Sequence, residues 1–507
     1  MNTVFSSILH GFATSLSLGP LFFSILGVFI GIIIGSIPGV GPTMVIAMML
    51  PITYVMDASQ GMLFMMGIFV GGMFGGSVSS ILLNVPGHAS AVVTCWDGHK
   101  LSEKGETKKA LSAALLASVF GGILSALALL FFSPALAKVS LAFGAKEFFA
   151  IGILGMVLVA YLESGNNLLK GCVTAGFGLF LGLIGFAPQT AYPRFTFGNF
   201  ELMSGLQLVP VLVGLFCLPE AFSLAGQKES KQKLDTSKLW LTMKDISSSL
   251  KDCLENWWML IKCGVISVII GVLPGAGGTI ATFISYAEAK RMSKHPETFG
   301  EGEVAGVLAA EVANNGASCS SLVPLLTMGI PGSATAAVFF GVLTLHGMTP
   351  GPQLFAKSAE TVYTLLSGTV LQQILLLVLG LLMIPILSKV AKLPSQILIP
   401  FILLFSFVGS YGCRSNMFDV YVMLVCGFVG FWLKKAGFPL GPCVLGIVLG
   451  SIIENNFRTA MALSKNSAAI LFKGWIPIVI YVVCAYMFLK PIFKSILEKR
   501  KAAKAIK

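Results

Sequence analysis

The stretch Pro38-Gly39-Val40-Gly41-Pro42-Thr43 interrupts one long apolar run, and Pro274-Gly275-Ala276-Gly277-Gly278-Thr279 interrupts another. Each stretch predicts a helix that ends, unwinds and restarts at the depth of a membrane. Hydrocarbon cannot satisfy exposed backbone N–H and C=O groups, so an unwound segment persists there only where it lines a polar cavity or site. Two such breaks, one in each half of the chain, indicate a duplicated membrane transporter.

The composition is that of an integral membrane protein. Of 507 residues, 55% are hydrophobic and 11% are charged, whereas soluble domains carry about 25% charged residues. Residues 1–56 contain no Asp, Glu, Lys or Arg, and neither do residues 58–96. No basic segment precedes the first apolar run, so we expect no cleaved signal peptide.

The net charge is +12, and the basic residues lie in the connectors and the tail, with clusters in a mid-chain segment and at the C-terminus. This distribution follows the positive-inside rule and predicts that both segments are cytoplasmic. It gives no reason to expect nucleic acid as a partner.

The apolar runs predict an all-α polytopic protein with about 12 transmembrane helices, since one crossing needs about 20 apolar residues. The longest polar segment divides the chain nearly in half. We therefore predict an N-terminal repeat half (residues 1–226), a polar cytoplasmic linker (227–256), a C-terminal repeat half (257–489) and a basic cytoplasmic tail (490–507).

The two halves resemble one another in two motifs that occur in the same order. Gly35-Ser36-Ile37-Pro38-Gly39-Val40-Gly41 matches Gly271-Val272-Leu273-Pro274-Gly275-Ala276-Gly277, and the segment 79–89 parallels 320–334 with a four-residue insertion in the second copy. Each half thus predicts a broken helix followed by a re-entrant hairpin with a Pro-Gly tip. Such repeats in transporters are often inverted across the membrane, with the site at their interface.

The residues of the breaks suit an anion site. Glycines permit a tight bend, Pro42 fits the first turn of a restarting helix, and a helix N-terminus carries a partial positive charge. The alternative is a kink that merely eases packing, which a single copy would favour and the duplication does not. The predicted substrate-binding residues at the breaks are Gly39, Gly41, Thr43, Gly275, Gly277 and Thr279.

The hairpins add neutral polar groups that can coordinate carboxylate oxygens or a dehydrated Na⁺. The alternative for each serine is close helix packing. For the asparagines we expect a functional role, because a buried amide needs several partners. The predicted substrate-binding residues here are Ser77, Asn84, Asn314, Asn315 and Ser318; backbone carbonyls at Pro86, Gly87, Pro331 and Gly332 are predicted to hold transported Na⁺, with no other metal.

Ionisable residues inside or beside membrane segments are functional candidates by default. Both breaks lack Asp or Glu nearby in the sequence, so we expect an uncharged site. The candidates elsewhere are Glu163, Glu311, Arg414, Asp419, Glu454 and Arg458, with His88 and His346 near the hairpin tips; the sequence leaves the roles of Glu454, Asp419, His88 and His346 open.

Several signatures of enzymes are absent from the sequence. There is no Gly-Lys dipeptide of a Walker A loop, no H-E-x-x-H and no G-x-S-x-G. We therefore expect no enzyme and no cofactor, and transport would draw on an ion gradient or a partner.

Four motifs together resemble the large membrane subunit of the tripartite tricarboxylate transporters, over nearly the whole chain. They are the first break with Leu50-Pro51-Ile52-Thr53-Tyr54, the tip Asn84-Val85-Pro86-Gly87, the stretch Asp97-Gly98-His99-Lys100-Leu101, and Leu445-Gly446-Ile447-Val448-Leu449-Gly450 leading to Glu454-Asn455-Asn456-Phe457-Arg458.

The resemblance implies a multi-pass permease of the bacterial inner membrane that works with a small membrane subunit and a periplasmic solute-binding protein. It implies import of citrate or another di- or tricarboxylate with a cation gradient, usually Na⁺, H⁺ being the other candidate. It also implies similarity to elevator-type carriers, in which a transport domain with both hairpins slides against a scaffold.

Two other functions stay open at this point. One is an ion antiporter or channel without an organic substrate, and the other is an intramembrane enzyme acting on a lipid-linked substrate. Within the leading hypothesis, Gly278 stands where the first break has Pro42, so the two breaks need not bind equivalent ligands.

Overall fold

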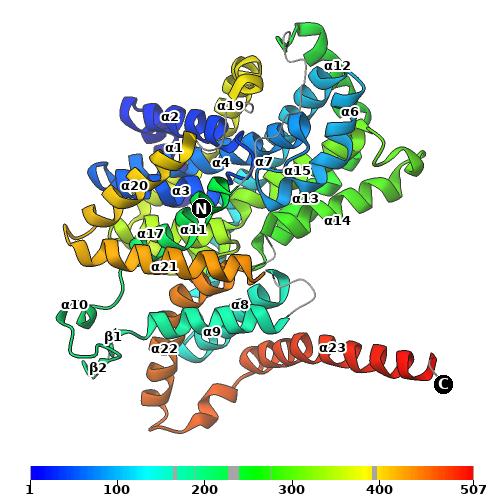
Figure 1. Ribbon diagram of the computed structural model, residues 1–507. Coiled ribbons are helices and arrows are strands. Elements are labelled where there is room, and N and C mark those ends of the chain that lie inside the picture. Colours follow the sequence, from blue (N-terminus) through cyan, green and yellow to red (C-terminus); the bar gives the residue numbers. More distant parts are fainter. Residues whose placement is uncertain are drawn as a thin grey trace. The chain divides into compact units, whose positions relative to one another are not determined.

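The computed structural model describes residues 2–163, 168–188, 190–226, 239–275, 277–390 and 397–505. Among these residues the fold is helical except for one hairpin of two-residue strands, β1 (Gly185–Phe186) and β2 (Pro193–Arg194). Residues 227–238 of the predicted linker and Ala276 of the second break lie outside the described residues. The chain forms two compact units (Figure 1): unit 1 contains residues 1–138 and 208–431, and unit 2 contains residues 139–207 and 432–507.

The first part of unit 1 is the segment with the first break and its hairpin. Long helices α2 and α4 pack along one another, and short helical pieces follow the hairpin. The elements are α1 (Asn2–Ser15), α2 (Leu18–Gly35), α3 (Pro42–Met49), η1 (Leu50–Val55), α4 (Ala58–Leu83), η2 (Ala89–Ala91), α5 (Val92–Thr94), the π-helical turn η3 (Cys95–His99), α6 (Lys100–Glu103) and α7 (Thr107–Ser140).

The second part of unit 1 contains the second break and its hairpin. Helix α15 packs against α13, α14 and, from the first part, α4, so α4 in blue and α15 in green lie in one unit (Figure 1). The elements are α11 (Leu208–Ala225), α12 (Met243–Glu255), α13 (Trp257–Val272), α14 (Gly277–Met292), η4 (Pro296–Thr298), α15 (Val304–Ser320), α16 (Leu322–Met328), α17 (Ala334–Leu345), α18 (Leu354–Lys357), α19 (Ala359–Val390), α20 (Leu398–Gly412) and α21 (Met417–Lys435).

Unit 2 joins two segments that are far apart in the sequence. Helix α22 packs against α8 and α9, and the contact is close because Gly178 and Gly446 have no side chain: a Cβ at Gly178 would lie 1.9 Å from the Cys443 carbonyl oxygen. The elements are α8 (Ala145–Glu163), α9 (Leu168–Gly182), β1, β2, α10 (Phe200–Met203), α22 (Gly441–Leu463), η6 (Ala468–Phe472) and α23 (Trp475–Ala505).

The helices are long and apolar enough for a multi-pass membrane protein. Within the described ranges, seven helices could span a membrane by length and composition, or eight if the bent pair α12–α13 is counted as one span. Shorter apolar helices, including α9, α17 and α20, accompany them. The all-α polytopic class predicted from the sequence is thus supported, whereas the count of about 12 crossings stays a prediction.

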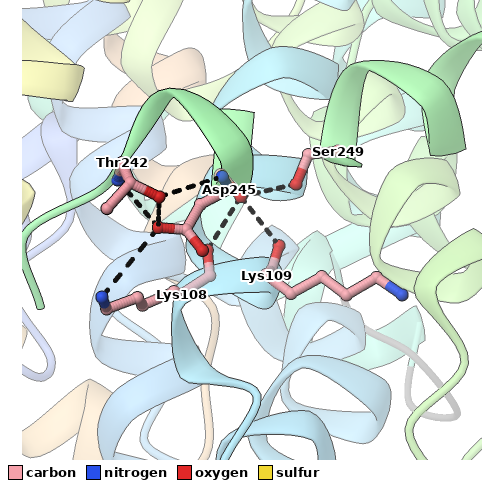
Figure 2. Close-up of polar contacts among 6 residues, drawn as sticks. Lys108, Lys109, Thr242, Asp245 and Ser249 are labelled. Atoms are coloured by element: carbon pink, nitrogen blue, oxygen red, sulfur yellow. Dashed lines mark hydrogen bonds and ion pairs between the residues drawn. The ribbon is translucent and has the colours of Figure 1, made fainter. Parts of the chain in front are cut away.

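Helix α12 lies within the predicted linker and is bent by 76° from α13. Its N-terminus has a capping box: the Asp245 N–H donates to Thr242 Oγ1, and the Thr242 N–H donates to the Asp245 carboxylate at 2.7 Å. Lys108 of α7 lies 3.9 Å from Asp245, and Ser249 shares a 2.5 Å hydrogen bond with Ser112 of α7. Figure 2 shows this contact, which attaches the start of α12 to the first turns of α7.

Four of the six predicted functional charges, Arg414, Asp419, Glu454 and Arg458, are ion-paired. Asp419 is buried and accepts two hydrogen bonds from the Arg414 guanidinium, at 2.9 and 2.5 Å. Glu454 accepts two from Arg194, at 2.7 and 3.1 Å, and one from Arg458 at 2.8 Å. These charges are compensated within α20–α21 and within unit 2, respectively.

Candidate functional site

The first break is a turn of six residues between α2 and α3. Helix α2 ends at Gly35, Gly39 has φ +78°, and α3 begins at Pro42 with Gly41 as its N-cap. A positive φ of this size favours glycine, and proline at the first position of a helix has no N–H to leave unsatisfied. The break predicted from the sequence is therefore present.

The second break has the same backbone conformation at its central glycine. Helix α13 ends at Val272, Gly275 has φ +77°, and α14 begins at Gly277 with φ +58°. A Cβ at Gly277 would meet no atom within 4 Å, so this glycine is required for its φ rather than for space.

The two hairpin tips also match each other. Asn84 (φ +54°) ends α4, and Gly329 (φ +77°) ends α16, both in the left-handed conformation. At each tip one N–H closes the hairpin, from Gly87 to the Gly76 carbonyl at 3.3 Å and from Gly332 to the Ser321 carbonyl at 3.1 Å. Eleven residues separate donor and acceptor in both cases. The four-residue insertion expected between residues 320 and 334 is therefore wrong, because Ser321 corresponds to Gly76 and not to Ser80.

Each tip packs against the break of its own half. A Cβ added at Gly87 would lie 3.0 Å from the Gly35 carbonyl oxygen, and one at Gly332 would lie 2.9 Å from that of Gly271. The Gly275 N–H also donates to the Gly332 carbonyl at 3.0 Å. Only glycine fits between hairpin and helix end at these two positions.

The restarting helix of each break meets the helix that leaves the other half's hairpin. Thr43 of α3 and Thr335 of α17 share a hydrogen bond of 2.6 Å between their hydroxyl oxygens. At the equivalent place on the other side, a Cβ at Gly278 of α14 would lie 3.2 Å from Ser90 Oγ of η2. Sequence reasoning grouped each break with its own hairpin and missed this exchange between the halves.

Asn314 is the centre of a buried polar network beside Gly278. Its Oδ1 accepts a 2.7 Å hydrogen bond from Ser90, and its Nδ2 lies 3.4 Å from both the Met73 carbonyl and Ser77 Oγ. His88 contacts the same groups, with Nδ1 2.9 Å from Ser90 Oγ and Nε2 3.1 Å from the Met73 carbonyl. The structure thus brings together Asn314 and Ser77, two predicted site residues, with His88, whose role the sequence left open, and it adds Ser90.

Other predicted site residues make local contacts. Asn315 and Ser318 are buried, but they bond to the carbonyls of Glu311 and Asn315 on their own helix. Asn84 is exposed, so the expectation of a buried amide is wrong there; its left-handed backbone closes α4. Thr279 is half-buried in the first turn of α14.

A buried carboxylate lies in the same region. Glu311 is fully buried on α15, and it accepts hydrogen bonds from Thr94 at 2.5 Å and Ser118 at 2.8 Å. A second carboxylate, Glu220 of α11, has its Oε1 3.7 Å from where a Cβ of Gly39 would stand. The prediction that no acid lies near the breaks is wrong, because tertiary packing brings in acids from distant segments. One sequence signal was available: Glu311 is the only formal charge between residues 304 and 356.

Asp97 fixes the segment after the first hairpin to the segment before α15. Its Oδ1 accepts backbone N–H bonds from Gly300, Gly302 and Glu303 at 2.8–2.9 Å, and its Oδ2 accepts the Tyr286 hydroxyl at 2.7 Å. The side chain is fully buried. Four donors satisfy the carboxylate, so the acidic residue of the Asp97–Leu101 motif positions the two hairpin segments relative to each other.

Broken helices and buried polar hairpins in a multi-span helical protein define the class of membrane transport proteins. Sequence comparison identifies the family within this class: residues 21–445 match the tripartite tricarboxylate transporter TctA family. The chain belongs to this family of transporter components, and it is not an enzyme.

Two relatives come from Agrobacterium vitis. The uncharacterised 52.8 kDa protein in the TAR-I ttuC′ 3′ region is 36% identical over 505 residues, which cover 98% of this chain and 99% of the relative. An uncharacterised protein in the TAR-II ttuC′ 3′ region is 35% identical over 230 residues, covering 45% of this chain and 95% of the relative.

Proposed function

We propose that the chain is the permease subunit of a binding-protein-dependent secondary transporter that imports di- or tricarboxylates such as citrate, driven by a cation gradient and most simply by Na⁺. One observation carries the proposal: each restarting helix faces the exit helix of the opposite hairpin, at Thr43–Thr335 and at Gly278–Ser90. Helix N-termini and hydroxyls converge at both places, and this combination favours anions.

The proposed binding groups come from both halves. Backbone N–H groups at Gly39, Gly41 and Gly277, with the hydroxyls of Thr43 and Thr279, would bind carboxylate oxygens. The Gly275 N–H already donates to the Gly332 carbonyl at 3.0 Å, so Gly275 fits this role less well. Ser77, Asn314, Asn315 and Ser318 would line the site, and carbonyls at Pro86, Gly87, Pro331 and Gly332 would hold Na⁺. The exposed Asn84 fits this role least well.

We further propose that the two parts of unit 1 are inverted repeats and that transport is of the elevator type. The matched φ values at Gly39 and Gly275, and the matched hydrogen bonds at Gly87 and Gly332, support a repeat. Both hairpins belong to unit 1, as expected if they move as one body.

The family description, a tripartite transporter, supports partners of two kinds. We propose a small membrane subunit and a periplasmic solute-binding protein, with the complex in the bacterial inner membrane.

The test is uptake of radiolabelled citrate into proteoliposomes that contain this chain, its small subunit and the binding protein, under an imposed Na⁺ or H⁺ gradient. Thr335→Val is expected to lower the initial rate. Thr344→Val is the matched control, because Thr344 lies on the same helix and bonds only to the carbonyls of Phe340 and Gly341. Absence of uptake of any di- or tricarboxylate under both gradients would refute the proposal.

A second candidate is an ion antiporter without an organic substrate. Buried Glu311 is the observation that favours it, because carriers of ions commonly place an acid within the membrane. Cation flux in proteoliposomes that lack both carboxylate and binding protein would support the antiporter.

A further inference from the structure

Glu311 has a buried carboxyl group, and the described residues offer it no opposite charge. Its carboxylate is fully buried, and its partners are the neutral hydroxyls of Thr94 and Ser118 together with the nearby Ser77 and Asn314. No Lys or Arg that the structure describes pairs with it. Hydrogen bonds to neutral donors offset only part of the cost of burying an ionised carboxylate, so binding of a cation at this place is favourable.

The surroundings of Glu311 are rich in oxygen. Its own two oxygens, Thr94 Oγ1, Ser118 Oγ and Ser77 Oγ come from four different helices, α15, α5, α7 and α4. Hydroxyl oxygens keep lone pairs after donating a hydrogen bond, so the same groups suit either a proton on the carboxylate or a Na⁺ held by oxygen ligands.

Few titratable groups compete with Glu311 for this role. The thiol of Cys95 interacts with its charge. His88 bonds to Ser90 and the Met73 carbonyl, and Cys253 on α12 is half-buried. The other titratable groups on elements packed against α15 have partners of their own or belong to exposed parts of their helices: Asp97 and His99 on η3, Lys108, Lys109 and Lys138 on α7, Lys262 and Cys263 on α13, Tyr286, Glu288, Lys290 and Arg291 on α14, and Lys244, Asp245, Lys251, Asp252 and Glu255 on α12.

Glu311 lies one helical turn before Asn314, one of the proposed substrate groups, so an anion bound by Asn314 would lie about 6 Å from the carboxylate. At this distance a carboxylate repels a bound anion strongly enough to weaken its binding about 100-fold. Neutralising Glu311 removes the repulsion.

Resting on the proposed function, we propose that Glu311 is the binding site of the coupling cation, and that neutralisation of its carboxylate by this monovalent cation permits the anionic substrate to bind. The cation is a proton or Na⁺. In either case the cation and the anion bind together, because the cation neutralises the carboxylate that would repel the anion and the anion in turn favours the neutralised state.

The experiment measures citrate binding to the purified protein in two series, one of NaCl against choline chloride at pH 7.5, the other of pH between 7.5 and 5.5 in choline chloride. The wild type is expected to bind citrate about 100-fold more tightly with Na⁺ or at low pH.

Glu311→Gln, an isosteric neutral variant, is expected to bind citrate tightly under all conditions of both series and to lose gradient-driven accumulation. Glu360→Gln, an exposed glutamate at the start of α19, is the matched control and should behave as the wild type. A cation dependence of Glu311→Gln equal to that of the wild type would overturn the proposal.

A second variant covers the case in which Glu311→Gln does not fold. Thr94→Val removes one donor to the carboxylate, so it moves the midpoint of the pH series upward if the cation is a proton. If the cation is Na⁺, the loss of an oxygen ligand raises the Na⁺ concentration at the midpoint of the NaCl series, where half of the gain in citrate affinity is reached. Unchanged midpoints in both series overturn the proposal.

Failure of the proposed function is distinguishable from failure of this inference. If the wild type binds no carboxylate, thermal unfolding of the purified protein in the same two series still reports on the cation. A Na⁺- or pH-dependent shift of the unfolding temperature that Glu311→Gln or Thr94→Val alters keeps Glu311 as a cation site; a shift common to all variants overturns it.

Discussion

Helices α4 and α15 precede the two hairpin tips at equivalent places, and they differ in what they present. In α4 the glycines bring backbone against backbone: a Cβ at Gly71 would lie 2.3 Å from the Val28 carbonyl oxygen of α2. In α15 the equivalent Gly316 faces a side chain: a Cβ there would lie 2.1 Å from Ser267 Oγ. The helix also carries the buried Glu311 and Asn314. The same backbone geometry thus serves a tightly packed frame in the first half, and in the second half it presents most of the polar side chains that we propose as ligands.

The largest expected effect comes from the residue that joins the two compared regions. Asp97→Ala leaves three backbone N–H groups and the Tyr286 hydroxyl without their acceptor, which we expect to destabilise unit 1 by about 3 kcal/mol or more. Thermal unfolding in detergent measures the change. Tyr286→Phe removes a single donor and should lower the stability by about 1 kcal/mol. Equal effects of the two variants would contradict the role of Asp97 in joining the two segments.

The next prediction tests the contrast between backbone and side-chain neighbours. Gly71→Ala is expected to destabilise the protein by about 1–3 kcal/mol, because the α2 backbone cannot move aside. Gly316→Ala should cost less than about 1 kcal/mol, because Ser267 can change its rotamer and alanine favours a helix. The unfolding temperatures of the two variants measure the difference. A larger loss of stability for Gly316→Ala than for Gly71→Ala would contradict the distinction between backbone neighbours in α4 and side-chain neighbours in α15.

A third prediction compares the two contacts between the halves. Asn314→Ala deprives Ser90 of its acceptor and removes an amide from the proposed site, so citrate uptake should fall about 10- to 100-fold. Thr335→Val breaks one hydrogen bond between hydroxyls and should lower uptake about fivefold. Initial rates normalised to folded protein provide the measurement, and the reverse order would move the centre of the site to α3 and α17.

The smallest effect lies outside both regions, in α12. The backbone N–H and hydroxyl of Thr242 hold the pKa of Asp245 below its ordinary value. The stabilisation is therefore present above the unfolded-state pKa of about 4 and is lost as pH falls through the lower folded value. Asp245→Asn should destabilise α12 by about 0.5–1 kcal/mol at pH 7 and have no effect near pH 2. Hydrogen exchange of residues 243–255 at both pH values measures this, and an equal effect at both would contradict the prediction.

The breaks and the hairpin tips were predictable from the sequence because their chemistry is local. Glycine at positive φ, as at Gly39 and Gly275, and proline at the start of a helix, as at Pro42, leave a signature in a few consecutive residues. The contacts of Thr43 with Thr335 and of Ser90 with Asn314 join residues more than 200 positions apart, and no local pattern specifies them. Glu311 shows the same limit: its isolation in an uncharged stretch was visible, but its hydroxyl partners come from three other helices.

The interleaved order of the two units has a consequence for synthesis. Helices α8 and α9 are made early, whereas α22, against which they pack, follows the 224 residues from 208 to 431. At about 5–20 residues per second, the ribosome needs roughly 11–45 s for that stretch. During this interval Gly178 of α9 has no Cys443 to contact, so α8 and α9 must stay in the bilayer as an incomplete pair, exposed to any membrane chaperone or protease, until the last quarter of the chain emerges.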